Sequence, residues 1–393
     1  MTNITEDIKY IGVNDREIDL FEGQYVVPNG MAYNSYVILD EKVAVMDTVD
    51  RHFTTEWLKN LESALAGRQP DYLIVQHMEP DHSASIAAVR QAYPAVRIVG
   101  NAKTLQMIEG YYGIACGTVE VKEGDVLDLG GLTLAFCMIP MVHWPETMAT
   151  WCAEERTIFS GDAFGTFGAL NGGVTDEQLD VEPFWEEMRR YYACIVGKYG
   201  QPVQRALAKV APLDIAMICS THGPVWRREI ARVVELYDKV SRYEGEPGAV
   251  IAYGSMYGNT EQMAETVARG LAAAGVRPIV VYNLSTADVS QVLRDIFRYD
   301  TLVVGSPTYN GQLYPPVDAL LRKIAERCIP HRRFACFGSF TWAGAAVRRM
   351  TEFAEGMKWP VVGAPVELKQ GYSTAVEPAC RVLVDALVED MKR

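Results

Sequence analysis

The sequence is poor in the features that build thiolate metal sites and membrane spans. Its eight cysteines are scattered and no two form a Cys-x-x-Cys pair, so we expect no zinc–thiolate or iron–sulfur centre within it. The most apolar stretch, residues 132–142, is interrupted by Thr133 and Pro140 and is far shorter than the roughly 20 apolar residues of a spanning helix. Residues 1–10 lack a basic segment followed by an apolar one, so no signal peptide is expected. These absences predict a soluble, cytoplasmic protein with no membrane partner.

Basic residues are also in deficit. The chain has 37 Lys and Arg residues against 50 Asp and Glu residues, a formal net charge of −13. A negative field repels a phosphate backbone, so nucleic acid is not an expected partner. The composition is otherwise ordinary for a globular protein, with 49% hydrophobic and 22% charged residues, which excludes disorder and a charge-rich coiled coil. At roughly 150 residues per domain, the 393 residues predict two or three domains.

A polar segment divides the chain into two halves of different kind. Residues 244–248, Glu-Gly-Glu-Pro-Gly, predict a linker between a first domain, residues 1–245, and a second domain, residues 249–393. The first domain mixes strands and helices. In the second, four predicted strands alternate with helices, at residues 249–253, 278–282, 301–305 and 334–338. This α/β alternation predicts a doubly wound parallel sheet.

Histidine is scarce, and its distribution is the most informative feature of the first domain. Only six histidines occur, and four of them lie close to the ends of predicted strands. The strand at 72–76 is followed by His77, Glu79 and Asp81, whose alternate spacing in an extended segment would direct them to one point. Each such residue alone is more commonly structural, but several strand ends that each deliver an imidazole or a carboxylate predict a shared metal site. The candidate ligands are His77, Glu79, Asp81, His82, His143, Asp162 and His222.

The pattern His-x-Glu-x-Asp-His at residues 77–82, followed by single His, Asp and His residues, resembles the metallo-β-lactamase superfamily and, within it, the flavodiiron proteins. The hydrolytic, zinc-binding relatives generally carry a histidine where Glu79 stands. A carboxylate at this position makes the ligand set harder and more anionic, which favours iron over zinc. The resemblance therefore implies an αββα sandwich for the first domain and a pair of irons bound to it.

The resemblance also implies roles for individual side chains. The implied division is one iron held by His77, Glu79 and His143 and the other by Asp81 and His222, with Asp162 bridging. His82 matches a position that ligates in some members and turns away in others, so both roles stay open. His82 and Tyr192 are the predicted catalytic residues, and Trp144 and Tyr191 are further candidates for the pocket wall.

Three loops of the second domain predict a nucleotide site. Residues 254–260, Gly-Ser-Met-Tyr-Gly-Asn-Thr, lie between a strand and a helix, where backbone N–H groups can bind a phosphate. No Gly-x-Gly-x-x-Gly or Gly-Lys-[Ser/Thr] motif accompanies them, which disfavours a dinucleotide fold and a P-loop NTPase. Loops 305–311 and 338–344 follow two further strands at the same sheet edge, where Tyr309 and Trp342 could flank a ring-shaped ligand.

This second domain resembles flavodoxin over its full length, which implies that it binds FMN. Flavodoxins usually carry threonine where this chain has Met256 or Tyr257, so phosphate contacts there are expected from the backbone. The candidate FMN contacts are Ser255, Met256, Tyr257, Gly258, Asn259, Thr260, Pro307, Thr308, Tyr309, Asn310, Ser339, Phe340, Thr341, Trp342, Ala343 and Gly344.

Together the two resemblances cover nearly the whole chain and imply an oxidoreductase with FMN and two iron ions as cofactors. Its implied reaction is the reduction of dioxygen to water, of nitric oxide to nitrous oxide, or of both. No rubredoxin module or nicotinamide-binding domain is evident, so electrons are expected from an external donor, a rubredoxin or a reduced deazaflavin coenzyme. The resemblance further implies a head-to-tail homodimer, or a dimer of such dimers, in which the FMN of one subunit serves the iron pair of the other.

Two alternatives come from other functional classes. A metal-dependent hydrolase with an appended flavodoxin domain would share the first-domain pattern, but Glu79 and the second domain argue against it. A non-catalytic electron carrier or oxygen sensor would need no intact metal site, whereas every candidate ligand is present. The choice between the two gases stays open: Glu22 stands where some relatives carry a histidine, so that position indicates no preference.

Overall fold

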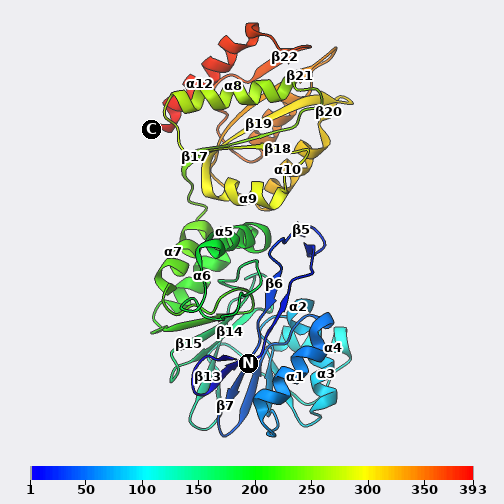
Figure 1. Ribbon diagram of the computed structural model, residues 1–393, viewed down its shortest axis with the longest axis vertical. Coiled ribbons are helices and arrows are strands. Elements are labelled where there is room, and N and C mark those ends of the chain that lie inside the picture. The colour runs from blue at the N-terminus through cyan, green and yellow to red at the C-terminus, as the bar shows by residue number, and fades with distance from the viewer. Residues whose placement is uncertain (1, 393) are drawn as a thin grey trace. The chain divides into compact units, whose positions relative to one another are not determined.

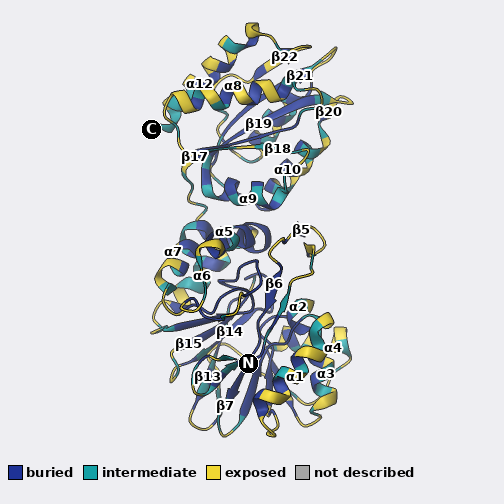
Figure 2. Cartoon of the chain, in the orientation of Figure 1, coloured by how far each residue is buried: buried dark blue, intermediate teal, exposed yellow. Residues whose placement is uncertain are grey.

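The computed structural model describes residues 2–392, which divide into two compact units, one ending at Ser241 and the other beginning at Arg242 (Figure 1). In both units the strands are mostly buried and the exposed residues gather on helices and loops (Figure 2). No helix within residues 2–392 is both long enough and apolar enough to cross a membrane.

Two sheets form the centre of the N-terminal unit. The seven-stranded sheet contains, in spatial order, β1 (Thr2–Asn3), β2 (Ile8–Tyr10), β7 (Tyr36–Leu39), β8 (Val43–Met46), β9 (Tyr72–Ile74), β10 (Arg97–Gly100) and β11 (Thr118–Glu120). The five-stranded sheet contains β12 (Val126–Asp128), β13 (Thr133–Met138), β14 (Met148–Cys152), β15 (Thr157–Gly161) and β16 (Met217–Ser220). Two ribbons are formed by β3 (Val13–Asp15) with β6 (Met31–Tyr33) and by β4 (Leu20–Phe21) with β5 (Tyr25–Val26).

Helices cover the outer sides of these sheets. The helices are α1 (Thr54–Leu65), α2 (Pro80–Ser83), α3 (Ile86–Ala92), α4 (Ala102–Tyr112), α5 (Glu182–Tyr191), α6 (Gly200–Val210) and α7 (Ile230–Ser241). In Figure 1, α1, α3 and α4 gather beside the seven-stranded sheet, and α5, α6 and α7 beside the five-stranded sheet. The αββα sandwich predicted for this half is therefore confirmed.

Local sequence accounts for the ends and the burial of these elements. The Asn101 side chain accepts hydrogen bonds from the backbone N–H groups of Lys103 and Thr104 and so caps α4, which ends at Gly113 with a φ of 68°. The Val-Ala-Val-Met sequence of β8 is buried throughout, as expected for a strand covered on both faces.

Two predicted elements of the N-terminal unit differ from the structure. The extended segment after β9 stops at Glu79, because Pro80 occupies the first turn of α2. Asp81 therefore lies on a helix, and the prediction that it points the same way as His77 and Glu79 is wrong. The helix predicted over residues 181–195 ends at Tyr191, and a π-helical turn follows over residues 192–196. Such turns re-aim neighbouring side chains and occur often at functional sites.

The C-terminal unit is built on a five-stranded parallel sheet. Its spatial order is β18 (Ile279–Asn283), β17 (Glu246–Tyr253), β19 (Tyr299–Tyr309), β21 (Arg333–Phe340) and β22 (Val366–Lys369), with β20 (Gln312–Leu313) antiparallel to β19. The helices are α8 (Asn259–Ala273), α9 (Val289–Arg298), α10 (Pro315–Glu326), α11 (Ala346–Gly356) and α12 (Glu377–Met391). The predicted doubly wound parallel sheet is confirmed.

Two features of this unit were not predicted from the sequence. Strand β17 begins at Glu246, inside the segment expected to be the linker, because the polar residues 246–248 pair in part with β19 before the apolar run starts. Strand β22 was not predicted, since its four residues are alternately buried and exposed and form no apolar run.

Candidate functional site

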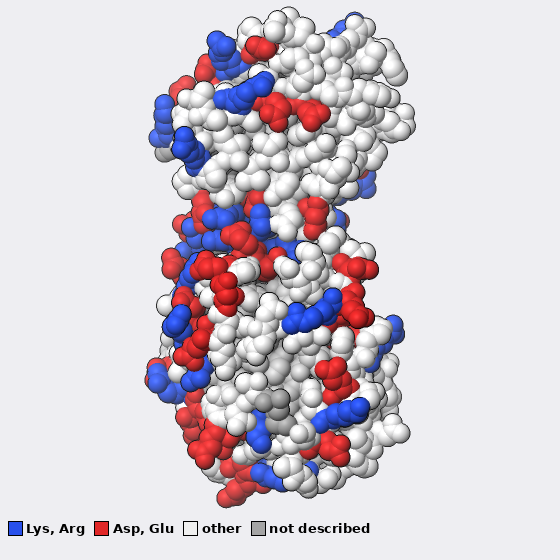
Figure 3. Space-filling model, in the orientation of Figure 1, with Lys and Arg blue, Asp and Glu red and all other residues white. Residues whose placement is uncertain are grey.

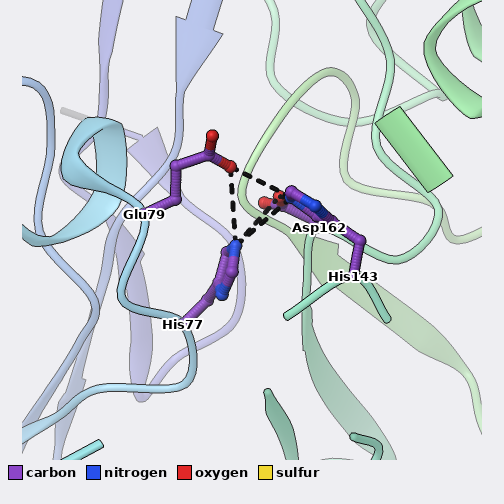
Figure 4. Close-up of side chains that lie close together, drawn as sticks. All are labelled: His77, Glu79, His143 and Asp162. Carbon is purple, nitrogen blue, oxygen red and sulfur yellow. Dashed lines mark hydrogen bonds and ion pairs between the residues drawn. The ribbon is translucent and has the colours of Figure 1, made fainter. Parts of the chain in front are cut away.

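The candidate ligands gather where strands of the N-terminal unit end. His77 and Glu79 follow β9, Asp81 and His82 lie on α2, His143 follows β13, Asp162 follows β15, and His222 follows β16. They form two groups, and within each group the possible ligand atoms lie within 4.8 Å of one another. The groups are His77, Glu79, His143 and Asp162 (Figure 4), and Asp81, His82 and His222. Every predicted ligand thus lies in one of the two groups.

The first group contains two imidazoles and two carboxylates. His143 Nε2 lies 3.0 Å from Glu79 Oε2 and 3.0 Å from Asp162 Oδ2. His77 Nε2 lies 3.3 Å from His143 Nε2 and 3.5 Å from Asp162 Oδ2. Figure 4 shows these side chains converging, with His77 and Glu79 on one loop and His143 and Asp162 on others. Two nitrogen and two oxygen donors directed at one point form a set that can bind a divalent or trivalent cation.

Asp162 joins the two groups. Its Oδ2 faces the first group, whereas its Oδ1 lies 2.8 Å from His82 Nε2 and 3.7 Å from His222 Nε2. Asp81 completes the second group, with Oδ1 3.3 Å from His82 Nε2 and Oδ2 3.2 Å from His222 Nε2. A carboxylate that directs one oxygen to each group is suited to bridge two metal ions.

Several buried polar atoms of the second group lack a well-formed hydrogen bond. Within residues 2–392 these are both carboxylate oxygens of Asp81, both ring nitrogens of His82 and Nε2 of His222. Apart from His82 Nδ1, they contact other members of the cluster at the ion-pair distances given above, without hydrogen-bond geometry. Buried donors and acceptors in this state favour an additional partner such as a metal ion. Because the donors are imidazoles and carboxylates without thiolates, the residues fit a pair of iron ions.

Hydrogen bonds behind the cluster fix two of the imidazoles. His77 Nδ1 donates to Glu146 Oε1 at 2.8 Å, and the same oxygen accepts the backbone N–H of Met78 at 2.9 Å. His222 Nδ1 donates to the Ala32 carbonyl oxygen at 2.7 Å. In both rings Nε2 is thereby left for the cluster, which is how outer contacts orient metal-binding histidines.

In this cluster, charged neighbours shift the pKa values of the side chains in the direction opposite to burial. Burial lowers the pKa of His143, but hydrogen bonds to Asp162 and Glu79 outweigh it and raise that pKa to about 9. The pKa of His82 is likewise raised to about 9, since Asp81 and Asp162 outweigh burial. Conversely, burial acts to raise the pKa of Asp162, but the neighbouring histidines hold it well below its usual value. In the metal-free protein, therefore, protons on the imidazoles balance the carboxylates, and metal binding must displace them.

Aromatic rings close the site around His222. The rings of Phe21, Tyr33 and Tyr191 lie 5.8, 5.9 and 5.5 Å from the His222 ring. Tyr192, the predicted catalytic tyrosine, instead packs against Tyr237 at 5.3 Å. The catalytic role of Tyr192 stays a prediction, but the ring contacts favour the neighbouring Tyr191.

Sequence reasoning missed some contributors to this site. Glu146 stands three residues after His143, in His-Trp-Pro-Glu, and this spacing is a signal that could have been used. Phe21 and Tyr33 carry no such signal, because the β4–β5 and β3–β6 ribbons bring them to the site from far along the chain. Trp144, a predicted wall residue, packs edge-on against His77 with ring centroids 5.2 Å apart.

The predicted FMN contacts surround a cavity of about 360 Å³ in the C-terminal unit. All of them line it except Gly258 and Gly344, and two residues not predicted, Gly311 and Gln370, line it as well. Gly258 instead precedes α8 with a φ of 85°, a left-handed conformation that favours glycine. Gln370 follows β22, and because that strand was not predicted, Gln370 was not predicted as a lining residue either.

The cavity offers neutral hydrogen-bonding groups to an anion. Ser255 Oγ accepts the backbone N–H of Gly258 at 3.1 Å, and the hydroxyls of Thr260 and Ser339 lie 3.0 Å apart. The lining residues include no Asp, Glu, Lys or Arg, and the surface around β20 is free of charged side chains in Figure 3. The first turn of α8 can therefore bind a phosphate through backbone N–H groups and hydroxyls. Trp342, which is 88% exposed, supplies an open aromatic face for a ring. These residues fit FMN.

Fold and site thus define a protein that joins a metallo-β-lactamase-like unit with a two-metal cluster to a flavodoxin-like unit. Comparison with known proteins agrees: residues 31–223 match the family described as ODP family beta lactamase, and residues 251–381 match flavodoxin. An Escherichia coli O1:K1 / APEC relative, the anaerobic nitric oxide reductase flavorubredoxin, is 31% identical over 354 residues, which cover 88% of this chain and 74% of the relative.

Solved structures give the same result. The rubredoxin oxygen:oxidoreductase of Desulfovibrio gigas superposes with a TM-score of 0.95 at 28% identity, covering 100% of this chain and 98% of that one. The flavodiiron protein of Giardia intestinalis superposes with a TM-score of 0.94 at 26% identity, covering 99% and 96%. The chain belongs to the flavodiiron protein family. The resemblance stated from the sequence is confirmed, and the predicted cofactors, FMN and two iron ions, are those that give the family its name.

Proposed function

We propose that this chain is an oxidoreductase that uses FMN and a diiron centre to reduce nitric oxide to nitrous oxide, dioxygen to water, or both. The observation that carries the proposal is Asp162, whose two oxygens face two groups of imidazole and carboxylate donors. The names of two relatives, a nitric oxide reductase and an oxygen oxidoreductase, support both gases as substrates. When bound, FMN would supply electrons and the iron pair would bind and reduce the gas.

The ligand assignment follows the two groups. We assign His77, Glu79 and His143 to one iron, Asp81 and His222 to the other, and Asp162 to both. His82 Nε2 is close to Asp81 and Asp162, at 3.3 and 2.8 Å, which supports its assignment to the second group. Glu146 would hold His77 in its metal-binding orientation.

The surrounding side chains would exclude water and position a hydrogen-bond donor. The Tyr191 hydroxyl is buried and makes no hydrogen bond within residues 2–392. Burial raises the pKa of Tyr191 well above its usual value, and the nearby Asp162 raises it further, so the phenol keeps its proton. We therefore expect Tyr191→Phe to lower turnover of the gas about 10-fold or more, because removing one hydrogen-bond donor from a reaction site typically costs about 10²–10³-fold. Tyr192→Phe serves as the matched control, and an equal loss in both variants would contradict this assignment.

The donor, the assembly and the location belong to the same proposal. The name of the Desulfovibrio gigas relative pairs rubredoxin with oxygen, which supports a rubredoxin as the external donor, with a reduced deazaflavin coenzyme as the other candidate. We propose the head-to-tail homodimer, or a dimer of such dimers, as the working assembly. The eight free cysteines suit the reducing cytoplasm.

One experiment tests the activity directly. The purified protein is analysed for iron, zinc and FMN, reduced anaerobically, and mixed with nitric oxide or with dioxygen in a stopped-flow instrument. We expect two irons and one FMN per chain, with flavin oxidation coupled to loss of the gas. Two zinc ions per chain, or a fully reduced protein that consumes neither gas, would refute the proposal.

A further inference from the structure

A small cavity lies in the N-terminal unit beside the metal cluster and is not lined by any of its ligands. It has a volume of about 20 Å³ and is enclosed by β14, β15, α6 and α7. Ala149 and Ile158 form its sheet side, and Val203 and Leu207 form part of its helix side. A molecule the size of water needs roughly 10–15 Å³ of such space, so the cavity has room for one small molecule.

The cavity is almost entirely apolar. Of its lining side chains only Ser160 and Tyr237 carry a polar atom, and Ser160 Oγ donates to the Ala163 carbonyl oxygen at 2.7 Å. A buried water typically makes about three hydrogen bonds, whereas here only the Tyr237 hydroxyl could provide one. Because apolar cavities of this kind stay dry and bind apolar gases, this space suits a small apolar molecule better than water.

The lining residues belong to two different parts of the unit. Ala206 and Leu207, on α6, are partly exposed to solvent. Val142 and Ala163 are the chain neighbours of two assigned iron ligands, His143 and Asp162. The cavity is therefore lined both by residues of a partly exposed helix and by residues that adjoin the assigned ligands in the chain.

We infer that this cavity is a binding site for the diatomic gas and part of its route to the metal cluster, an inference that rests on the proposed function. Nitric oxide and dioxygen are small and weakly polar, so both leave water readily for apolar space. An ion or a polar reductant gains nothing from such a lining. The site would thus concentrate the substrate beside the ligands while it excludes water.

Xenon, an apolar atom of similar size, is the probe. Crystals of the wild-type protein are pressurised with xenon, and anomalous density is sought in the cavity. Ala206→Phe is then made to fill the cavity from its α6 side, with Ala208→Phe as the matched control, since Ala208 is an exposed residue of the same helix that does not line the cavity. Leu207→Trp repeats the blockade if Ala206→Phe does not fold.

We expect a xenon peak in the wild-type protein and in Ala208→Phe but none in Ala206→Phe. The second-order rate constant for the reduced protein with each gas should fall about threefold or more in Ala206→Phe alone, because its ring fills the space that the gas would occupy. Iron content, FMN content and turnover at saturating gas should not change. An absent xenon peak, or equal rates in the two variants, would overturn the cavity inference and leave the proposed function intact. A wild-type protein that binds xenon but consumes neither gas would overturn the proposed function and the substrate role together.

Discussion

Glu146 offers a stringent test of the proposed metal site because it contacts His77, a proposed ligand, without belonging to either group of candidate ligands. Its Oε1 accepts hydrogen bonds from His77 Nδ1 and from the Met78 backbone, and both His77 and Glu146 are buried. Glu146→Gln removes the negative charge but keeps an oxygen that can accept both bonds. Glu146→Ala removes the charge and both hydrogen bonds, and leaves His77 Nδ1 with only the Thr147 hydroxyl oxygen at 3.4 Å. The pair of variants therefore separates the electrostatic role of the carboxylate from its orienting role.

The expected magnitudes follow from these contacts. A carboxylate that orients a metal-bound imidazole is typically worth 10- to 100-fold in metal affinity, or about 1.4–2.7 kcal/mol. We expect about a 10-fold loss of iron affinity for Glu146→Gln and about 100-fold for Glu146→Ala. Loss of these two buried hydrogen bonds, at about 1–3 kcal/mol each, should also lower the stability of the metal-free Glu146→Ala protein by about 2–6 kcal/mol. Neither the loss of iron affinity nor the loss of stability should occur in a variant that removes a carboxylate elsewhere.

The assay measures iron affinity and stability on the same samples. Chelator-treated protein is titrated anaerobically with ferrous iron against a coloured competing chelator, and the free energy of unfolding is measured in denaturant. Glu154→Ala is the control, because Glu154 also accepts hydrogen bonds but is exposed. Its donors are the Thr133 backbone and hydroxyl at 3.1 and 2.8 Å and the Cys152 thiol at 3.7 Å. If Glu146→Ala binds iron as tightly as Glu154→Ala does, then His77 is not a ligand held in place by Glu146.

Three further predictions concern the ligand set and the flavin. Glu79→His should shift the metal bound during expression from iron toward zinc, since it replaces a hard oxygen donor by an imidazole, and metal analysis against wild-type protein checks this. In the metal-free protein the pKa of His82 and of His143 is about 9, above the usual value. Their protonated rings therefore stabilise the fold fully below about pH 6.5, and this contribution is lost as the pH rises through about 9, so the Tm of chelated protein should fall across that window and a flat profile would contradict it. Trp342→Ala should weaken FMN binding about 3- to 10-fold while Trp342→Phe retains most of it, as fluorescence titration of the apoflavoprotein can show, and equal affinities would exclude ring stacking.

The fold could be predicted where the sequence shows a regular strand–helix alternation or a continuous apolar run. The apolar strands at 249–253, 301–305 and 334–338 alternate with helices and lead directly to the parallel sheet that the structure contains. Strand β22 has no such run, because it lies at the edge of its sheet and buries only alternate residues. Pro80 interrupts the polar alternation of residues 77–81, because proline favours the first turn of a helix, and at this position that preference decides the local structure.

The gathering of the candidate ligands could be predicted from the sequence, whereas the residues around them could not. Side chains that follow strand ends, such as Asp162 and His222, are found from sequence because parallel strand ends meet in space. Rings such as Phe21 and Tyr33 reach the cluster through ribbons distant in sequence, and no local pattern reports that approach. The choice between Tyr191 and Tyr192 could not be predicted either, because the π-helical turn after Tyr191 decides which of these two adjacent tyrosines faces the cluster.

The neutral lining of the cavity in the C-terminal unit has a consequence for how the coenzyme is retained. Its hydroxyls and helix N-terminus act over short range, whereas a lysine or arginine cradle would act through a charge that mobile ions screen. Raising the ionic strength should therefore release little flavin from this protein. Because the site uses no Lys or Arg side chain, a strongly acidic chain can bind an anionic phosphate without a neighbouring positive charge.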